Sequence, residues 1–205
     1  MQVRRPSEGE LAARLTQYGV GGGSDAGELA VGDLDGDRLL EVIVANPEQA
    51  NVVVFHQREK SGLDLGTDSP SFLGSTQLRV ADLNGDGKSE VLVLSTKENS
   101  LGVSRFEQGK LTFPESLAIE GNIKAFDVSD VDKDGTNEII AVTEGSGRGP
   151  EKKTLVAIGR RDAAGNWIFS SDSNKPTEVK LAASVERLTL TDVNLDGRAD
   201  YLFFV

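Results

Sequence analysis

The chain has 205 residues, 38% of them hydrophobic and 27% charged, which is enough for one substantial core or a row of small repeated units. Its 23 glycines predict many turns, and because it has no cysteine, disulfides, thiolate metal sites and thiol catalysis are excluded. The net charge of −11 is consistent with either a basic partner or bound cations.

Residues 1–27 form an N-terminal segment that differs from the rest of the chain. The stretch 9–19, GELAARLTQYG, favours a short helix, while 2–6 and 13–19 are also candidate strands. No apolar signal-peptide core follows the first charged residues, and no run of 18 apolar residues predicts a membrane span.

Four nine-residue segments then align without gaps along residues 28–205. They are DLDGDRLLE (33–41), DLNGDGKSE (82–90), DVDKDGTNE (130–138) and DVNLDGRAD (192–200). Their first residues lie 49, 48 and 62 positions apart, and the long third interval contains the inserted stretches 144–153 and 170–176. A fixed period of this size is typical of repeat architectures, so it decides the fold class.

Short strand-like runs flank each segment. The preceding runs are 28–32, 77–81, 123–129 and 185–191, and the following runs are 42–45, 91–94, 139–142 and 201–205. The following runs do not alternate apolar with polar residues, which predicts strands buried on both faces. Third strands are expected at 51–57, 101–107 and 154–160, and fourth strands at 110–113 and 166–170.

The pattern predicts an all-β fold of β-propeller type, built from four-stranded antiparallel blades that begin at about residues 28, 77, 123 and 185. The chain then holds three full blades and two strands of a fourth. Residues 1–27 could supply the missing strands and close a small propeller. Alternatively, the chain is a segment of a larger ring, or other blades or another chain complete it. The sequence leaves both arrangements open.

The residue types in the four segments point to calcium. Positions 1, 3 and 5 carry Asp or Asn and position 9 carries Glu or Asp, which together supply the oxygen ligands that calcium prefers. An EF-hand needs Glu at position 12, where the chain has Val44, Val93, Ala141 and Phe203. The acid at position 9 separates the segments from ordinary turns, and four equivalent copies argue against one catalytic centre.

These residues resemble the FG-GAP and VCBS-type repeats, best known from the propeller of integrin α subunits, over residues 28–205. The Phe-Gly and Gly-Ala-Pro segments of the integrin version are missing, so the likeness is closer to the VCBS type. The resemblance implies up to four Ca²⁺ ions, bound by the side chains at positions 1, 3, 5 and 9 and the carbonyl at position 7. The implied ligands are Asp33, Asp35, Asp37, Leu39 and Glu41; Asp82, Asn84, Asp86, Lys88 and Glu90; Asp130, Asp132, Asp134, Thr136 and Glu138; and Asp192, Asn194, Asp196, Arg198 and Asp200.

The first segment departs from the others, because its glycine stands at position 4 (Gly36) and Arg38 occupies position 6. Glycine at position 6 of the other segments suits a left-handed turn, so the first segment is expected to bind calcium most weakly. Fourteen of the ligand side chains are carboxylates, and four bound Ca²⁺ ions would bring the net charge from −11 to −3. The excess of acidic residues is therefore expected to bind metal ions rather than a basic partner.

We expect a non-catalytic, calcium-stabilised scaffold for protein interaction or adhesion, with the ligand bound through rim loops, in a secreted, periplasmic or cell-surface location. Whether the chain is part of a larger enzyme stays open. The alternative is a carbohydrate-binding propeller, a lectin or the accessory domain of a polysaccharide-degrading enzyme, using Trp167 and Phe169. Packing in the blade is the favoured role for these two residues, and a structural role is favoured for His56. The insertion 144–153 is the best candidate for a variable contact surface.

Overall fold

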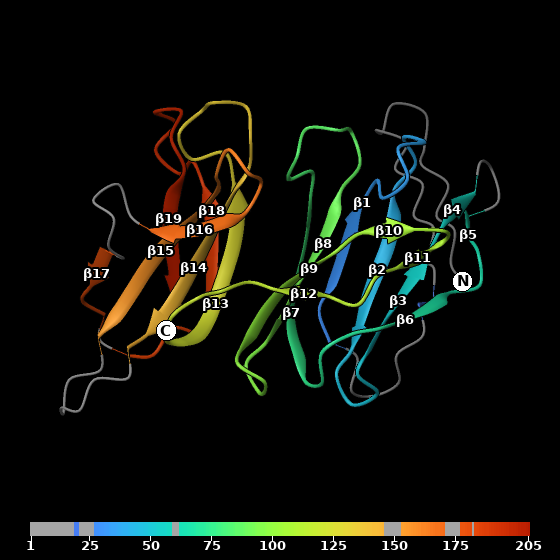
Figure 1. The fold of residues 1–205 in the computed structure, drawn as a ribbon, viewed down its shortest axis with the longest axis horizontal. Coiled ribbons are helices and arrows are strands. Elements are labelled where there is room, and N and C mark those ends of the chain that lie inside the picture. Colours follow the sequence, from blue (N-terminus) through green and yellow to red (C-terminus); the bar gives the residue numbers. More distant parts are fainter. Residues whose placement is uncertain (1–18, 21–26, 59–61, 146–152, 171–176, 182) are drawn as a thin grey trace, which may run out of the picture.

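The computed structural model describes residues 19–20, 27–58, 62–145, 153–170, 177–181 and 183–205 (Figure 1). Every regular element in these ranges is a β-strand. In that part of the chain, no helix is long and apolar enough to cross a membrane. The expected helix at 9–19 and nearly all of the N-terminal segment lie outside the described residues, as does most of the insertion 144–153.

Besides two small hairpins, the strands form three larger antiparallel sheets and one pair. The first sheet has the order β1 (Leu29–Gly32), β2 (Glu41–Asn46), β3 (Asn51–Phe55) and β6 (Thr67–Pro70). The second has the order β7 (Ser75–Ala81), β8 (Glu90–Ser95), β9 (Ser100–Ser104) and β12 (Glu115–Ser116). The third has the order β13 (Asn122–Ser129), β14 (Glu138–Glu144), β15 (Thr154–Arg161) and β16 (Trp167–Ser170), with β17 (Thr177–Val179) also paired to β15. The pair is β18 (Arg187–Thr191) with β19 (Asp200–Phe204).

This architecture confirms the predicted all-β class of propeller-type repeats with antiparallel blades. Two small hairpins, β4 (Gln57–Arg58) with β5 (Gly62–Leu63) and β10 (Phe106–Glu107) with β11 (Lys110–Leu111), extend the first two sheets. The expected fourth strand at 110–113 was wrong. Lys110 and Leu111 pair back onto β10 through a tight turn with Gly109 at φ +82°, and the short β12 takes the place beside β9. No sheet closes on itself within the described residues.

Three hydrophobic cores lie between successive sheets, so the sheets stack face to face. The central strands feed two cores at once: Val91 and Val93 of β8 enter the first core, whereas Leu92 and Leu94 enter the second. Every residue of β8 and of β14 is buried, which includes the apolar runs 91–94 and 139–142 that were expected to be buried on both faces. Each fully buried Val, Leu or Ile contributes about 1.5–3 kcal/mol, so these strands stabilise both neighbouring sheets.

The last strand differs. Tyr201 and Phe203 of β19 pack on the third core, but the alternate side chains Leu202 and Phe204 are 38% and 53% exposed. The prediction of two buried faces was therefore wrong for β19. The physical reason is that none of the described sheets covers its outer face, although its sequence is as apolar as that of β8.

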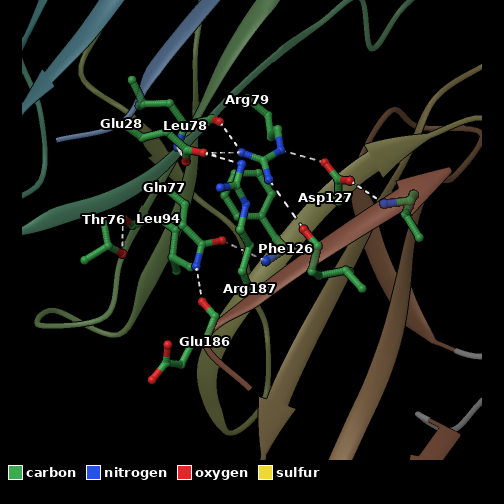
Figure 2. A network of polar contacts seen from close by, with 12 residues as sticks. Glu28, Thr76, Gln77, Leu78, Arg79, Leu94, Phe126, Asp127, Glu186 and Arg187 are labelled. Atoms are coloured by element: carbon green, nitrogen blue, oxygen red, sulfur yellow. Dashed lines mark hydrogen bonds and ion pairs between the residues drawn. The ribbon is translucent and has the colours of Figure 1, made fainter. Parts of the chain in front are cut away.

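The innermost strands β1, β7, β13 and β18 meet in a polar network around Arg79 (Figure 2). The Arg79 guanidinium donates to Glu28, just before β1, at 3.1 Å and to Asp127 of β13 at 2.6 Å. The second oxygen of Asp127 accepts the Leu190 N–H of β18 at 2.7 Å. One arginine thus links the second sheet to the first and the third, and through Asp127 to the fourth.

Two further contacts of this network join residues that are far apart in the sequence (Figure 2). Arg187 of β18 donates to the Glu28 carboxylate at 2.9 Å, although the two residues are 159 positions apart. Gln77 of β7 donates to the Glu186 carbonyl at 3.0 Å. The inner strands of the second sheet and of the final pair are therefore within side-chain reach of each other.

Candidate metal loops

The four repeated segments connect the first and second strands of each sheet, and we name them loop 1 (33–41), loop 2 (82–90), loop 3 (130–138) and loop 4 (192–200). All four lie at the same end of the molecule (Figure 1). Adjacent loops touch: the Ser89 N–H donates to the Asp33 carbonyl at 2.8 Å, and the Asn137 side chain donates to the Asp82 carbonyl at 2.9 Å. Loops 1, 2 and 3 therefore form a continuous rim, and loop 4 lies at the same end of the molecule.

The aspartate at position 1 organises the backbone of each loop. In loop 1, Asp33 accepts the Gly36 N–H on Oδ1 at 2.7 Å and the Arg38 N–H on Oδ2 at 2.8 Å. The Oδ2 atoms of Asp82, Asp130 and Asp192 likewise accept the N–H of position 6 at 2.9, 3.0 and 2.7 Å. Asp and Asn favour such local bonds, which explains why the sequence folds into a tight loop here.

The acids at positions 5 and 9 each use one oxygen in the same way in every loop. Position 5 accepts the N–H of position 7, at 2.7–2.8 Å. Position 9 accepts the N–H of position 2, at 2.9 Å. Glu41, Glu90 and Glu138 do so while 1%, 5% and 3% exposed. The other oxygen accepts a side-chain amide in Glu90 and Asp196 and is left for a further contact in the acids of loops 1 and 3.

Two positions in every loop have a left-handed backbone. Position 6 has φ between +70° and +92°, and position 4 has φ between +61° and +84°. Loop 2 alone has glycine at both positions, Gly85 and Gly87; loop 1 has Arg38 at position 6, and loops 3 and 4 have Lys133 and Leu195 at position 4. Loop 1 therefore differs from loops 3 and 4 only in which of the two positions holds the left-handed non-glycine residue. A left-handed non-glycine residue costs about 1–2 kcal/mol, and three loops carry one each.

The carboxylates of loops 1 and 3 converge. Ligand oxygens of Asp33, Asp35 and Asp37 lie within 4.8 Å of one another, and so do those of Asp130, Asp132 and Glu138. Loops 2 and 4 have asparagine at position 3, and there the side-chain amide donates a hydrogen bond to one carboxylate of the same loop. Asn84 donates to Glu90 at 2.9 Å, and Asn194 donates to Asp196 at 3.2 Å.

Burial separates the acids at position 9 from those at positions 1 and 5. Desolvation raises the pKa of Glu41, Glu90 and Glu138, and neighbouring aspartates of the same loop add to the effect. Burial also acts to raise the pKa of Asp82, but the N–H groups that it accepts outweigh this and lower it. In loops 1 to 3, the carboxylate at position 9 is therefore the one whose charged form a bound cation would stabilise most.

The residue opposite position 9 on the third strand is a functional candidate that sequence reasoning missed. It is His56 in the first sheet, Arg105 in the second and Arg160 in the third. His56 Nδ1 lies 3.5 Å from Glu41, and Arg160 Nε lies 4.0 Å from Glu138 and 3.2 Å from Asp132. The charge of Arg105 lowers the pKa of Glu90. A signal existed, since His56 and Arg105 each follow position 9 by 15 residues.

Trp167 and Phe169 of β16 lie in packed positions. Both pack against the second core, with ring centroids 6.5 Å apart, and the Arg161 guanidinium lies 5.0 Å from the Trp167 ring. Their side chains are only partly exposed. The geometry therefore accounts for both aromatic residues by packing between blades.

Comparison with known proteins assigns the chain to a family. The family model described as FG-GAP-like repeat matches residues 33–93 and again residues 82–141. Each match runs from one loop to the strand that follows the next loop, and together they cover more than half of the chain. No curated protein matches the chain. Loop 4 lies beyond the matched stretches but repeats the hydrogen bonds of the other three. The chain is a member of the FG-GAP-like repeat family.

Proposed function

We propose that this propeller-type scaffold is stabilised by calcium in its four loops and uses the loop-bearing rim to bind a protein partner, without catalysis. The observation that carries the proposal is the shared geometry of the loops. In each of them, a backbone N–H group bonds one oxygen of the acid at position 5, and another bonds one oxygen of the acid at position 9. The second oxygen is left for an ion in loops 1 and 3, whereas in loops 2 and 4 an ion would displace the asparagine amide from Glu90 or Asp196.

The donor set fits calcium. Carboxylate, amide and backbone oxygens are the ligands that a hard cation with six to eight ligands takes, and the described loops offer all three kinds. The ligands are those at positions 1, 3, 5 and 9, with the position-7 carbonyls of Leu39, Lys88, Thr136 and Arg198. Bound calcium would neutralise carboxylates that otherwise repel one another and would fix the turn between the first two strands of each sheet.

The proposed role as a binding scaffold follows from rigidity and from the family. Strands buried on both faces hold the loops in fixed positions, and loops on a rigid scaffold commonly carry recognition. FG-GAP-like repeats are generally non-catalytic, and the four equivalent loops offer no single acid and base pair. Nothing in the packing of Trp167 favours a carbohydrate ligand over a protein.

Affinities of about 10⁻⁶ to 10⁻³ M are expected for sites of this kind. Such sites would be empty at resting cytosolic calcium. The proposal therefore includes a secreted, periplasmic or cell-surface location, where calcium is high enough to fill them.

The test is thermal melting of the chain in calcium and in EGTA, together with a count of bound calcium. A site that is saturated at 100-fold its Kd contributes about 2.7 kcal/mol, which corresponds to roughly 5–10 °C in Tm. We expect a rise of at least that size. An unchanged Tm with no bound calcium would refute the proposal.

A matched control lies outside the loops. Asp162 accepts the N–H groups of Ala164 and Asn166 in an ordinary turn. Asp162→Asn should lower Tm equally in calcium and in EGTA, whereas Asp130→Asn in loop 3 should remove part of the calcium effect. Equal behaviour of the two variants would mean that the loops are only turns.

A further inference from the structure

We propose that loop 1, unlike the other loops, binds a divalent transition cation of the zinc type through His56, Glu41 and Asp35. This inference rests on the proposed function, because it assumes that the loops hold cations. It changes the kind of ion for one loop and adds a ligand from the third strand of the sheet, outside the nine-residue repeat.

The three side chains are placed together by three parts of the first sheet. Asp35 lies in the loop, Glu41 begins β2, and His56 directly follows β3. One ligand atom from each lies within 4.8 Å of the others, and His56 Nδ1 is 3.5 Å from Glu41 Oε1. Ligands bound about 2.0–2.2 Å from a tetrahedral ion are roughly 3.4 Å apart, so this pair already has the spacing of two zinc ligands.

The burial of Glu41 points independently to a cation. Its side chain is 1% exposed, and Oε2 accepts the Leu34 N–H at 2.9 Å. Oε1 lies 3.5 Å from His56 Nδ1, a distance longer than the about 2.7–3.2 Å of an ordinary N–H···O bond. A buried carboxylate is costly unless it is paired with a cation or coordinates a metal.

The other sheets meet this need with arginine, which the first sheet lacks at the equivalent place. Arg160 lies 3.2 Å from Asp132 and 4.0 Å from Glu138 in loop 3, and Arg105 lowers the pKa of Glu90 in loop 2. A guanidinium cannot ligate a metal, whereas imidazole can. The exchange of arginine for histidine therefore turns a compensating charge into a ligand.

The position of His56 is fixed by its surroundings. Its ring lies against Phe106, with centroids 5.2 Å apart, and its backbone N–H donates to Asp64 at 2.9 Å. Calcium prefers oxygen ligands alone, while imidazole with carboxylates suits zinc and other first-row transition dications. The mixed ligand set thus selects against calcium at this loop.

The experiment uses the single histidine of the chain as a reporter. In protein saturated with calcium, one equivalent of Zn²⁺ is added while the imidazole ¹⁵N resonances are followed by NMR. We expect the Nδ1 resonance to move to a new position at one equivalent, and excess calcium not to reverse the change. An imidazole that does not respond, or that calcium restores, would overturn the inference.

Two variants separate this site from a lone surface histidine. His56→Arg installs the residue of the second and third sheets and should weaken Zn²⁺ binding at least tenfold, measured by equilibrium dialysis. Asp35→Asn should also weaken it, and because Asp35 is not buried this variant avoids the folding cost of changing Glu41. Zn²⁺ affinity unchanged in Asp35→Asn would argue against the three-ligand site.

The same samples distinguish the two proposals. If calcium still raises the Tm of His56→Arg, the calcium scaffold stands whatever the zinc result. If wild-type protein binds Zn²⁺ but its Tm ignores calcium, the inference survives and the calcium proposal fails. Lys97→Arg, on the surface away from loop 1, should leave both measurements unchanged.

Discussion

Loops 1 and 2 fold the same nine-residue segment in different ways. Loop 2 has glycine at both left-handed positions, and its Asn84 amide donates to the buried Glu90 at 2.9 Å. Loop 1 has Arg38 in a left-handed conformation, and its aspartates Asp33, Asp35 and Asp37 bring their oxygens within 4.8 Å of one another. In loop 2 a hydrogen bond within the loop satisfies the buried carboxylate, whereas in loop 1 three carboxylates lie close together.

The difference teaches that a repeated ligand pattern need not give equivalent sites. In loop 2 the Asn84 amide and two nearby arginines already stabilise the buried Glu90 carboxylate, so a bound ion would stabilise this loop less. In loops 1 and 3 four carboxylates stand at the ligand positions, so the metal-free state is strained by repulsion. The dependence of each loop on its ion should follow the residue at position 3.

The largest expected effect comes from Asn84→Asp, which gives loop 2 the four acids of loops 1 and 3. Without metal, the variant loses the hydrogen bond to Glu90 and places a like charge beside it. This should cost about 2 kcal/mol, or roughly 4–8 °C in Tm. In calcium the loss should be largely recovered. Equal losses with and without calcium would contradict the comparison, and Asn166→Asp in the 162–166 turn is the control.

A smaller effect is expected from the left-handed residues. Arg38→Gly should raise the free energy of unfolding by about 1 kcal/mol, since glycine adopts φ +70° without steric cost. Gly87→Ala should lower it by a similar amount, because nothing lies within 4 Å of the added methyl group and only the backbone is strained.

Gly109→Ala is the matched control for the backbone effect. Gly109 has φ +82° and an equally open surrounding, but it lies in the β10–β11 turn outside the loops. Denaturant unfolding with and without calcium gives the three values. The comparison would fail if Arg38→Gly proved destabilising in metal-free protein.

The smallest expected effect is on pH dependence. Burial holds the pKa of Glu41 and Glu90 above the ordinary value of 4.5, so their contribution to stability is present below that pH and is lost as pH rises through the raised pKa. Metal-stripped protein should therefore lose stability from these groups as pH rises above about 4.5. Calcium binds the deprotonated form, so the Tm difference between calcium-loaded and metal-stripped protein should widen with pH.

The two loops should differ in this trend as well. Burial raises the pKa of both glutamates, but two side chains, Arg105 and Arg161, oppose the rise at Glu90, whereas His56 alone opposes it at Glu41. Glu41→Gln should flatten the decline of metal-stripped protein more than Glu90→Gln does, as measured by Tm from pH 4.5 to 7.5. If both variants reduced the decline of Tm with pH by the same amount, the expected difference between loops 1 and 2 would be contradicted.

The sequence predicted the strands and loops well because both have strong local causes. Apolar runs such as Val91–Leu94 can only be buried strands here, and Asp82 bonds its own loop wherever the chain places it. The left-handed backbone at Lys133 and Leu195 was not predictable from residue type, because neither favours that conformation. Long-range pairings such as His56 with Glu41 depend on strand register, which a single sequence indicates only through the repeat spacing.

The same limit explains the errors. The stretch 110–113 has the composition of a strand, and two of its residues do form one, but Gly109 folds them back onto β10. The outer face of β19 is apolar in sequence and exposed in the structure, because burial depends on a neighbour that composition does not reveal.

Arg79 has a consequence for how such an array could change in evolution. Repeat proteins whose units touch only their neighbours can gain or lose a unit without harm to the rest. Here one guanidinium contacts the units before and after its own and also approaches the Leu188 carbonyl of the last. Inserting or deleting a repeat between residues 82 and 187 would carry β18 out of reach of Arg79 and Glu28. The contacts among the inner strands thus constrain the number of repeats between Glu28 and β18, whereas no such contact among the described residues constrains the loops at the rim.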